Sequence, residues 1–277
     1  MEFSEIYLPI TKELREVEAE LKAVMKSLGG TSARDIFKYF FSDSEKYLRP
    51  ILALLSAKAI NNQLPESVYH ELTQLCVGIE LIHNASLIHD DIIDEDSIIR
   101  NQQALNKVYG NKIAILAGDS LYSRAFFIFS DKLPKIFSKT MVKVIKTMSI
   151  AEILNARTST INREMYLKIV EGKTAFFMSV CCGLGATLAG ANEKEINALS
   201  NYGHNLGIAY QILNDYIDKD PVAIKNISIE DAFKFASTAK DALKNIKNSI
   251  YIESLINLVD YVLDFYEPTI EMSSIEI

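Results

Sequence analysis

Hydrophobic residues recur every three or four positions along most of the chain, the spacing that gathers them on one face of an α-helix. The first run starts at Ile10 and stops at Gly29 and Gly30, a pair typical of a helix C-terminus. Pro50 and Pro65 stand where helices would begin, and the second of these helices runs on to an acidic cluster at residue 90. Further helices are predicted over 112–131, 134–156, 163–190, 193–218, 228–247 and 249–266.

Signals for other secondary structure are weak. No segment joins alternating polarity to a tight turn, so no strand pair is predicted. Only residues 218–228, which contain Pro221, interrupt the helical periodicity. With 11 Gly and 6 Pro in 277 residues, a loop-rich sandwich and a disordered chain are excluded. The sequence predicts one all-α domain over residues 1–277.

Composition narrows the functional classes. The net charge of −7 argues against a nucleic-acid partner. The three cysteines form no C-x-x-C pair, which is typical of reduced thiols in a cytoplasmic protein, and the N-terminus has no signal-peptide pattern. Residues 174–192 carry no charge, but their glycines and hydroxyl groups favour a buried helix, so no stable membrane span is expected.

The first group with candidate chemistry is acidic. Asp90, Asp91 and Asp94 end a largely apolar helix at spacings of three and four residues, so we expect their carboxylates on one face. Like charges at that spacing repel each other, and a bound divalent cation would remove the repulsion. Mg²⁺ prefers such hard oxygen ligands and often shares them with substrate phosphates. The alternative is a solvated acidic helix end.

A second polar group recurs 125 residues later. Gln211, Asn214, Asp215 and Asp218 follow one another at one-turn steps, with apolar residues between them. Two such groups, each late in a long apolar helix, could face each other across a bundle and hold metal.

Cations accompany these acidic groups. Lys46 and Arg49 stand just before a predicted helix start, where free backbone N–H groups also favour anions. His83 lies on the same helical face as Asp90, although a lone histidine is more often an ordinary core or surface residue. Lys173 opens the uncharged helix and is either a surface lysine or a phosphate ligand.

Taken together, these motifs make the chain resemble the trans-isoprenyl diphosphate synthases, or polyprenyl synthetases, over about residues 35–220. The most specific part is Glu80 to Asp94, which is similar to that family's first aspartate-rich motif. Leu48-Arg49-Pro50, Gly118-Asp119-Ser120-Leu121, Lys173-Thr174-Ala175 and Gln211 through Asp218 follow in the family's order. The resemblance implies a single helical bundle around a central cavity, and a homodimer.

The resemblance also implies a reaction, the Mg²⁺-dependent head-to-tail condensation of isopentenyl diphosphate with an allylic diphosphate. Mg²⁺ supplies Lewis-acid stabilisation as the allylic diphosphate leaves. The resulting cation has to be kept from water until the double bond of isopentenyl diphosphate reaches it. By position, the isopentenyl diphosphate ligands are Lys46, Arg49, His83 and Arg100.

The remaining family positions concern the allylic substrate. The groups that bind magnesium and the allylic diphosphate correspond to Asp90, Asp91, Asp94, Asn214, Asp215 and Asp218. The residues that flank the leaving group correspond to Lys173, Thr174 and Gln211. Of these, Asp90, Asp91, Asp94, Lys173, Gln211 and Asp215 are the candidate catalytic residues.

Several positions depart from the family pattern. Ser44-Glu45 replaces a Gly-Gly pair, and Tyr47 and Ile99 stand where arginine is common. Asn214 replaces the first aspartate of the second group and brings no charge to a metal. A loop rich in glycine and lysine is missing after that group, and the C-terminal region is short. The losses at Ile99, at Asn214 and in the loop fall on the allylic side, which leaves a non-catalytic subunit of a heteromeric synthase as an alternative.

A class I terpene cyclase is a further alternative, but its second motif, N-D-x-x-S-x-x-x-E, fails here because Asp218 and Val222 occupy its last two positions. For product length, the family position five residues before the first aspartate is Ala85, followed by Ser86, and both side chains are small. An open tunnel would then need a deeper floor, for which Phe126, Phe127 and Phe129 are candidates. The expected product has geranylgeranyl length or more.

Overall fold

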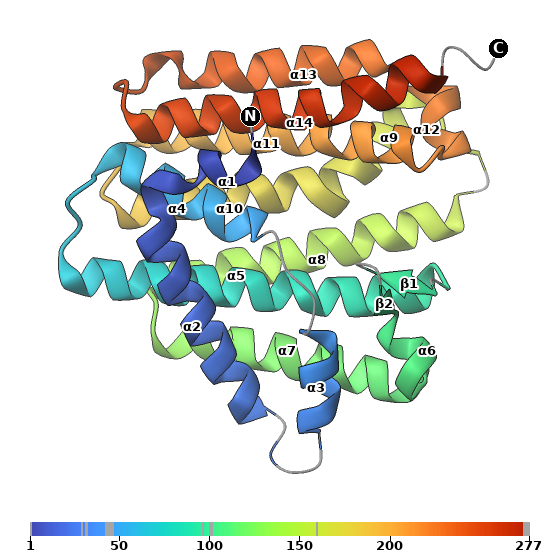
Figure 1. Ribbon diagram of the computed structural model, residues 1–277, viewed down its shortest axis with the longest axis horizontal. Coiled ribbons are helices and arrows are strands. Elements are labelled where there is room, and N and C mark those ends of the chain that lie inside the picture. Colours follow the sequence, from blue (N-terminus) through green and yellow to red (C-terminus); the bar gives the residue numbers. More distant parts are fainter. Residues whose placement is uncertain are drawn as a thin grey trace. The chain divides into compact units, whose positions relative to one another are not determined.

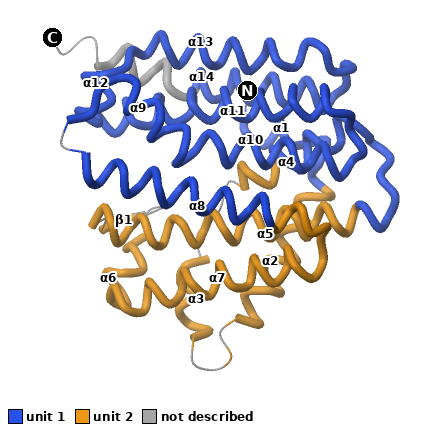
Figure 2. Tube along the Cα trace, turned by 180° about the vertical axis from the view of Figure 1, so that it is seen from behind, with its two compact units in different colours: residues 1–11, 52–68, 139–277 blue, residues 12–51, 69–138 orange. Residues whose placement is uncertain are grey.

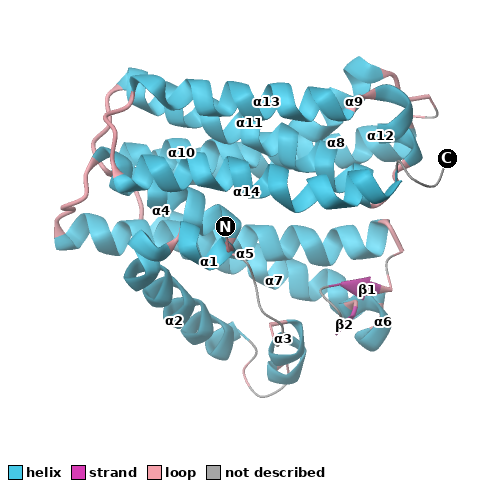
Figure 3. Ribbon diagram, turned by 45° about the horizontal axis from the view of Figure 1, so that its top comes forward, coloured by secondary structure: helices cyan, strands magenta, loops and turns pink. Residues whose placement is uncertain are grey.

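The computed structural model describes residues 2–28, 30, 33–41, 47–95, 97–99, 102–158 and 160–273 (Figure 1). Helices make up nearly all of this part of the chain, which confirms the all-α fold class (Figure 3). The expectation of no strand pair is wrong in one place, because β1 (Ile98–Ile99) pairs antiparallel with β2 (Gln102–Gln103). Strands of two residues are too short to show alternating polarity in the sequence.

The described chain divides into two compact units, coloured separately in Figure 2. One unit, called unit 1 below, contains residues 1–11, 52–68 and 139–277, and the other, unit 2, contains residues 12–51 and 69–138. Four helices carry the chain between the units: α2 (Thr11–Leu28), α4 (Leu48–Ile60), α5 (Glu66–Ile93) and α8 (Lys135–Arg157). The expectation of a single domain over residues 1–277 stays a prediction.

In unit 2, α5 is the helix that carries the first acidic group. Around it the unit also holds α2, α3 (Arg34–Phe40), α6 (Leu105–Tyr109) and α7 (Asn111–Asp131). At Gly78 of α5, a Cβ atom would lie 2.7 Å from Cζ of Phe129 on α7, so glycine lets the phenylalanine ring rest on the helix backbone. Leu72, Leu75 and Ile79 of α5 are fully buried.

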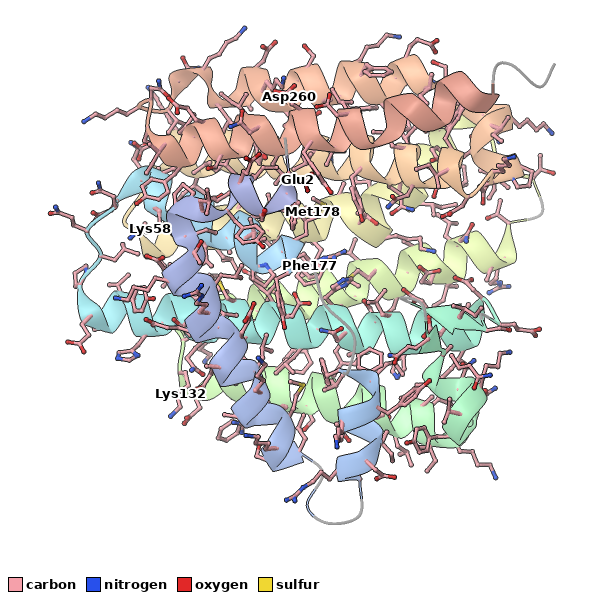
Figure 4. All side chains as sticks on the ribbon, in the orientation of Figure 1. Glu2, Lys58, Lys132, Phe177, Met178 and Asp260 are labelled. Carbon is pink, nitrogen blue, oxygen red and sulfur yellow. The ribbon has the colours of Figure 1, made fainter. Side chains whose placement is uncertain are left out.

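Unit 1 is built around α11 (Glu193–Ile217), which contacts α9 (Arg163–Val170), α10 (Phe176–Leu188) and α12 (Pro221–Asn226). It also contacts α13 (Ile229–Ala242), the short turn η3 (Leu243–Asn245) and α14 (Ile250–Ser273). Phe177 and Met178, labelled in Figure 4, are buried on α10. Two short N-terminal helices, α1 (Phe3–Ile6) and η1 (Leu8–Ile10), complete the unit, and α1 contacts α14.

Two predicted elements differ in detail. The interval 218–228, expected to be irregular, contains α12, which Pro221 opens and Asp220 caps by accepting hydrogen bonds from the N–H groups of Val222 (2.7 Å) and Ala223 (2.8 Å). The predicted helix 163–190 is continuous from Arg163 to Leu188, but its middle is a π-helical turn, η2 (Glu171–Ala175). A π-turn widens the helix locally and often marks a functional site.

In the part of the chain that the structure describes, two helices are long and apolar enough to cross a membrane: Asn111–Asp131 and Arg163–Leu188. In the second, 72% of the most apolar window is buried inside the protein, as expected for the core helix predicted from the sequence. In the first, which is α7, 39% of that window is buried.

Candidate active site

The first acidic group lies where α5 ends, in unit 2. The predicted helical spacing is present, since the N–H of Asp94 donates to the carbonyl of Asp90 at 2.8 Å. The three carboxylates differ in exposure, however: Asp91 is only 4% exposed, Asp90 is half-buried and Asp94 is exposed. The side chain of Asn106 donates to the backbone carbonyl of Asp91 at 3.1 Å, which ties the end of α5 to α6. Asp90 and Asp94 are therefore the more accessible pair.

His89, next to this group, was not singled out in the sequence. Its Nε2 lies 3.2 Å from the carbonyl oxygen of Ile115 and 3.8 Å from a carboxylate oxygen of Asp119. A Cβ at Gly118 would overlap the imidazole ring, so the glycine makes room for the histidine. Burial, with the charges of Asp90 and Asp119, raises the pKa of Tyr122 on the same face of α7. The sequence feature that could have pointed to His89 is Gly118-Asp119, a helical glycine followed by a carboxylate.

The predicted isopentenyl diphosphate ligands also belong to unit 2. Arg49 lies in the first turn of α4 and is half-buried. His83 is half-buried on α5, seven residues before Asp90, and its carbonyl accepts a hydrogen bond from Ser86 at 2.8 Å. Lys46 and Arg100 lie outside the described residues. The structure thus places two of the four predicted cations.

The second acidic group lies at the end of α11, in unit 1, and forms a chain of hydrogen bonds. Tyr166 of α9 donates to Oδ2 of Asp215 at 2.5 Å, and the amide of Gln211 donates to Oδ1 at 2.8 Å. Thr174 in the π-turn donates to the side-chain oxygen of Gln211 at 2.7 Å. Residues of α9 and α11 therefore meet at one carboxylate, and the π-turn joins them through Gln211.

Burial is the main influence on ionisation in this chain of hydrogen bonds. It raises the pKa of Asp215, although the hydrogen bonds from Tyr166 and Gln211 and the charge of Lys173 act in the opposite direction. Burial and the neighbouring Asp215 also raise the pKa of Tyr166 above its ordinary value. The tyrosine therefore keeps its proton and acts as the donor.

The π-turn also carries Lys173. Its ammonium group lies 2.7 Å from Glu152 of α8, and neither side chain is more than 25% exposed. A Cβ at Gly172 would lie 2.6 Å from the Cβ of Ala151, so α8 and the turn approach closely beside the ion pair. Sequence reasoning missed Glu152, although it is the one acidic residue in the stretch 135–157 and has apolar neighbours.

The other two members of the second group are placed differently. Asn214 is half-buried within α11, whereas Asp218 is exposed and caps the helix end, its N–H donating to the Asn214 carbonyl at 2.9 Å. Among the described residues, no three His, Cys, Asp or Glu side chains gather closely enough to form a metal site by themselves. The carboxylate oxygens of the two acidic groups and the side-chain oxygen of Asn214 are ligands of a kind that suits Mg²⁺. This ion takes one or two protein carboxylates and completes its octahedral coordination with phosphates and water.

The candidate chain-length residues are all in unit 2. Ala85 is fully buried and Ser86 is 7% exposed, as expected for residues lining an interior space. Phe126 is half-buried, whereas Phe127 is 52% exposed and lies 5.2 Å from the guanidinium carbon of Arg124. The exposure of Phe127 does not favour it as a tunnel floor. Phe129, fully buried against Gly78, is better placed within this unit.

Comparison with known proteins supports the resemblance seen in the motifs. The chain is 34% identical to the geranylgeranyl diphosphate synthase of Methanosarcina mazei, over 71% of this chain and 62% of that protein. It is 31% identical to the octaprenyl diphosphate synthase of Escherichia coli strain K12, over 65% of this chain and 55% of that protein. The chain thus aligns with less than two thirds of the length of these relatives.

The fold is similar to that of a solved structure, a decaprenyl diphosphate synthase from Rhodobacter capsulatus, with a TM-score of 0.84 and 22% identity. That match covers 96% of this chain and 99% of the other. The polyprenyl synthetase family profile matches residues 31–239, more than half of the sequence, and this span includes both acidic groups and the π-turn. The chain therefore belongs to the polyprenyl synthetase family.

Proposed function

We propose that this protein is a trans-prenyltransferase that lengthens an allylic diphosphate with isopentenyl diphosphate in a Mg²⁺-dependent, head-to-tail reaction. The observation that carries the proposal is the presence of both polar groups of the family within its matched span, each at the end of a long helix. The named relatives are synthases of prenyl diphosphates of different lengths, so they support the reaction class without selecting one product.

In this proposal Asp90 and Asp94 hold Mg²⁺ at the end of α5. At the end of α11, Asp215, Asp218 and the side-chain carbonyl of Asn214 offer oxygen ligands. When bound, Mg²⁺ neutralises the diphosphate so that its bond to the allylic carbon can break. Lys173 binds the leaving diphosphate by its charge, and Thr174, whose hydroxyl donates to Gln211, orients that side chain beside Asp215. Apolar walls exclude water until the new carbon–carbon bond forms, and loss of a proton restores the double bond.

Arg49 and His83, with Lys46 and Arg100, are assigned to the diphosphate of isopentenyl diphosphate, which stays intact throughout the reaction. Such a group needs binding but no activation as a leaving group, and guanidinium and imidazole donors provide that binding.

A direct assay tests the function. Purified protein is incubated with Mg²⁺, isopentenyl diphosphate and geranyl, farnesyl or geranylgeranyl diphosphate, and the dephosphorylated products are separated by length. We expect elongated products that disappear when EDTA removes the metal. Cyclic hydrocarbons formed without isopentenyl diphosphate would identify a terpene cyclase. No product in either assay, with activity appearing on addition of a partner chain, would identify a non-catalytic subunit.

For product length, we propose the geranylgeranyl product or a longer one, because Ala85 and Ser86 leave room five and four residues before Asp90. Ala85→Phe should shorten the product, since a ring would fill the space used by the growing chain. Phe129→Ala should lengthen it, and Phe37→Ala, which truncates a buried ring on α3, serves as the matched control. A wild-type product of farnesyl length would contradict the open tunnel.

We also propose that the active form is a cytoplasmic homodimer in which α7 lies in the interface. Ile113, Ile115, Leu116 and Phe127 of α7 are 36–60% exposed, an apolar set for which a second copy of the chain is a suitable partner. Leu116→Lys should yield a monomer by light scattering. Ile224→Lys, at an equally exposed position on α12, should leave the dimer intact.

A further inference from the structure

Tyr166 was not among the residues that the motifs single out, yet it makes the shortest side-chain contact to the second acidic group. It belongs to the second turn of α9, is 4% exposed, and donates to Oδ2 of Asp215 at 2.5 Å. The ring is therefore held by packing, and the hydroxyl group has one defined direction. A hydrogen bond from a buried hydroxyl to a carboxylate is among the stronger kinds found in proteins.

The contact matters because of what else holds Asp215. Its second oxygen accepts from Gln211, one turn earlier on α11, and Gln211 in turn accepts from Thr174 in the π-turn. A carboxylate held at one oxygen can still rotate about its side-chain bonds. A carboxylate held at both oxygens, by donors on two different helices, is fixed in plane and direction.

We propose that Tyr166 is a positioning residue for metal–diphosphate binding: its hydroxyl fixes Asp215, and through Gln211 this fixes the orientation of Thr174. Partners of this kind behind a metal site typically change metal affinity by about 10- to 100-fold when they are removed. The inference rests on the proposed function, because it presumes that the second group receives a metal-bound diphosphate.

The choice of donor follows from the local charge. A lysine or arginine at this position would fix Asp215 equally well, but its positive charge would cancel the negative charge that attracts a cation. Tyrosine donates a hydrogen bond without bringing charge. Burial keeps the hydroxyl protonated by raising its pKa.

The test measures metal binding without turnover. Mn²⁺ serves as the paramagnetic substitute for Mg²⁺, inorganic pyrophosphate supplies the diphosphate, and the free ion is followed by electron paramagnetic resonance. Tyr166→Phe keeps the buried ring and removes the hydroxyl group. We expect it to weaken Mn²⁺ binding by about tenfold or more.

Tyr202→Phe is the matched control. Tyr202 is also a buried tyrosine of unit 1, and its hydroxyl donates to the backbone carbonyl of Leu255 at 2.7 Å, away from the second acidic group. Both variants should lower the melting temperature by a similar small amount, since each loses one buried hydrogen bond. Only Tyr166→Phe should change Mn²⁺ affinity. Equal affinity in the two variants would overturn the inference.

A double-mutant cycle tests whether Tyr166 acts through Asp215. In an Asp215→Asn background, Tyr166→Phe should cost little additional affinity, because the carboxylate that it positions is gone. A full, additive loss would overturn the positioning role. If the wild-type protein elongates prenyl diphosphates and Tyr166→Phe binds Mn²⁺ as tightly as the wild type does, this inference alone is refuted. A wild-type protein with neither activity nor Mn²⁺ binding would refute the proposed function itself.

Discussion

Two glycines at the contact between α10 and α11 should differ in the stability that the protein loses when each is replaced by alanine. Gly203 of α11 faces α10, and an added Cβ would lie 2.6 Å from the carbonyl oxygen of Met178 and 2.8 Å from Sγ of Cys182. Gly183 of α10 faces α11, and its added Cβ would lie 2.5 Å from the hydroxyl of Ser200, with the next atoms at 3.8 Å or beyond. One glycine meets backbone, and the other meets the rotatable end of a side chain.

The magnitudes follow from this contrast. Replacing a helical glycine by alanine gains about 1 kcal/mol from backbone entropy at either position. At Gly203 the helices have to separate, and overpacking of this kind costs about 1–3 kcal/mol. Taking about 3 kcal/mol, because backbone cannot rotate away, Gly203→Ala should lose about 2 kcal/mol net. At Gly183 a turn of the Ser200 hydroxyl relieves the overlap, so Gly183→Ala should be neutral or slightly stabilising.

Urea unfolding followed by far-ultraviolet circular dichroism measures the difference as a shift in midpoint. A loss of about 2 kcal/mol in the free energy of unfolding corresponds to a decrease of about 4–8 °C in the melting temperature of a protein of this size. Ser200→Ala in the Gly183→Ala background removes the hydroxyl altogether and should recover any residual loss. Equal stability of Gly203→Ala and Gly183→Ala would show that the close approach of α10 and α11 at Met178 is wrong.

Three further predictions concern the site and the core. Asp90→Ala or Asp94→Ala should lower turnover by orders of magnitude with helicity unchanged by circular dichroism, whereas near-normal turnover would mark the group as a solvated helix end. Restoring charge through Ile99→Arg with Asn214→Asp should lower the KM for the allylic diphosphate more than that for isopentenyl diphosphate, and equal shifts would contradict an allylic-side weakness. All three cysteines are buried, and burial raises the pKa of Cys182 to about 12 and also raises that of Cys76. The thiols should therefore react with Ellman's reagent only after unfolding. Rapid reaction of the folded protein would contradict their burial.

The long helices could be predicted because their apolar spacing and their end signals agree. The run ending at Gly29 became α2, which ends at Leu28, and the run from Pro65 became α5. The pattern could not predict elements that are too short to repeat it. The two-residue strands β1 and β2 and the six-residue helix α12 give too few positions for a periodicity. For α12 the cap was readable in Asp220-Pro221, which is a local signal rather than a periodic one.

The candidate site likewise contains residues that the sequence could nominate and residues that it could not. Motif order nominated Asp215, Gln211 and Thr174, and the structure joins them by hydrogen bonds. Spacing within one helix could not nominate Tyr166 or Glu152, because each makes its contact from another element. Tyr166 reaches Asp215 from α9, and Glu152 reaches Lys173 from α8. Such contacts depend on how helices pack. The sequence marks them only by residue type, as a tyrosine or a lone carboxylate among apolar neighbours.

If the proposed function holds, the local charges require the second group to receive a diphosphate only together with its metal. Lys173, the cation closest in sequence to the π-turn's Thr174, is already neutralised by Glu152 at 2.7 Å. The partners of Asp215, Tyr166 and Gln211, are neutral donors and offset none of its charge. With Asp218 and Asp220 counted, the five side chains sum to −3 when ionised, so a bare diphosphate would meet repulsion in a partly buried site. A bound divalent cation offsets two of these charges, which Lys173, already paired with Glu152, does not do alone. The requirement for metal would then follow from the arrangement of this chain's own charges, as well as from the chemistry of the leaving group.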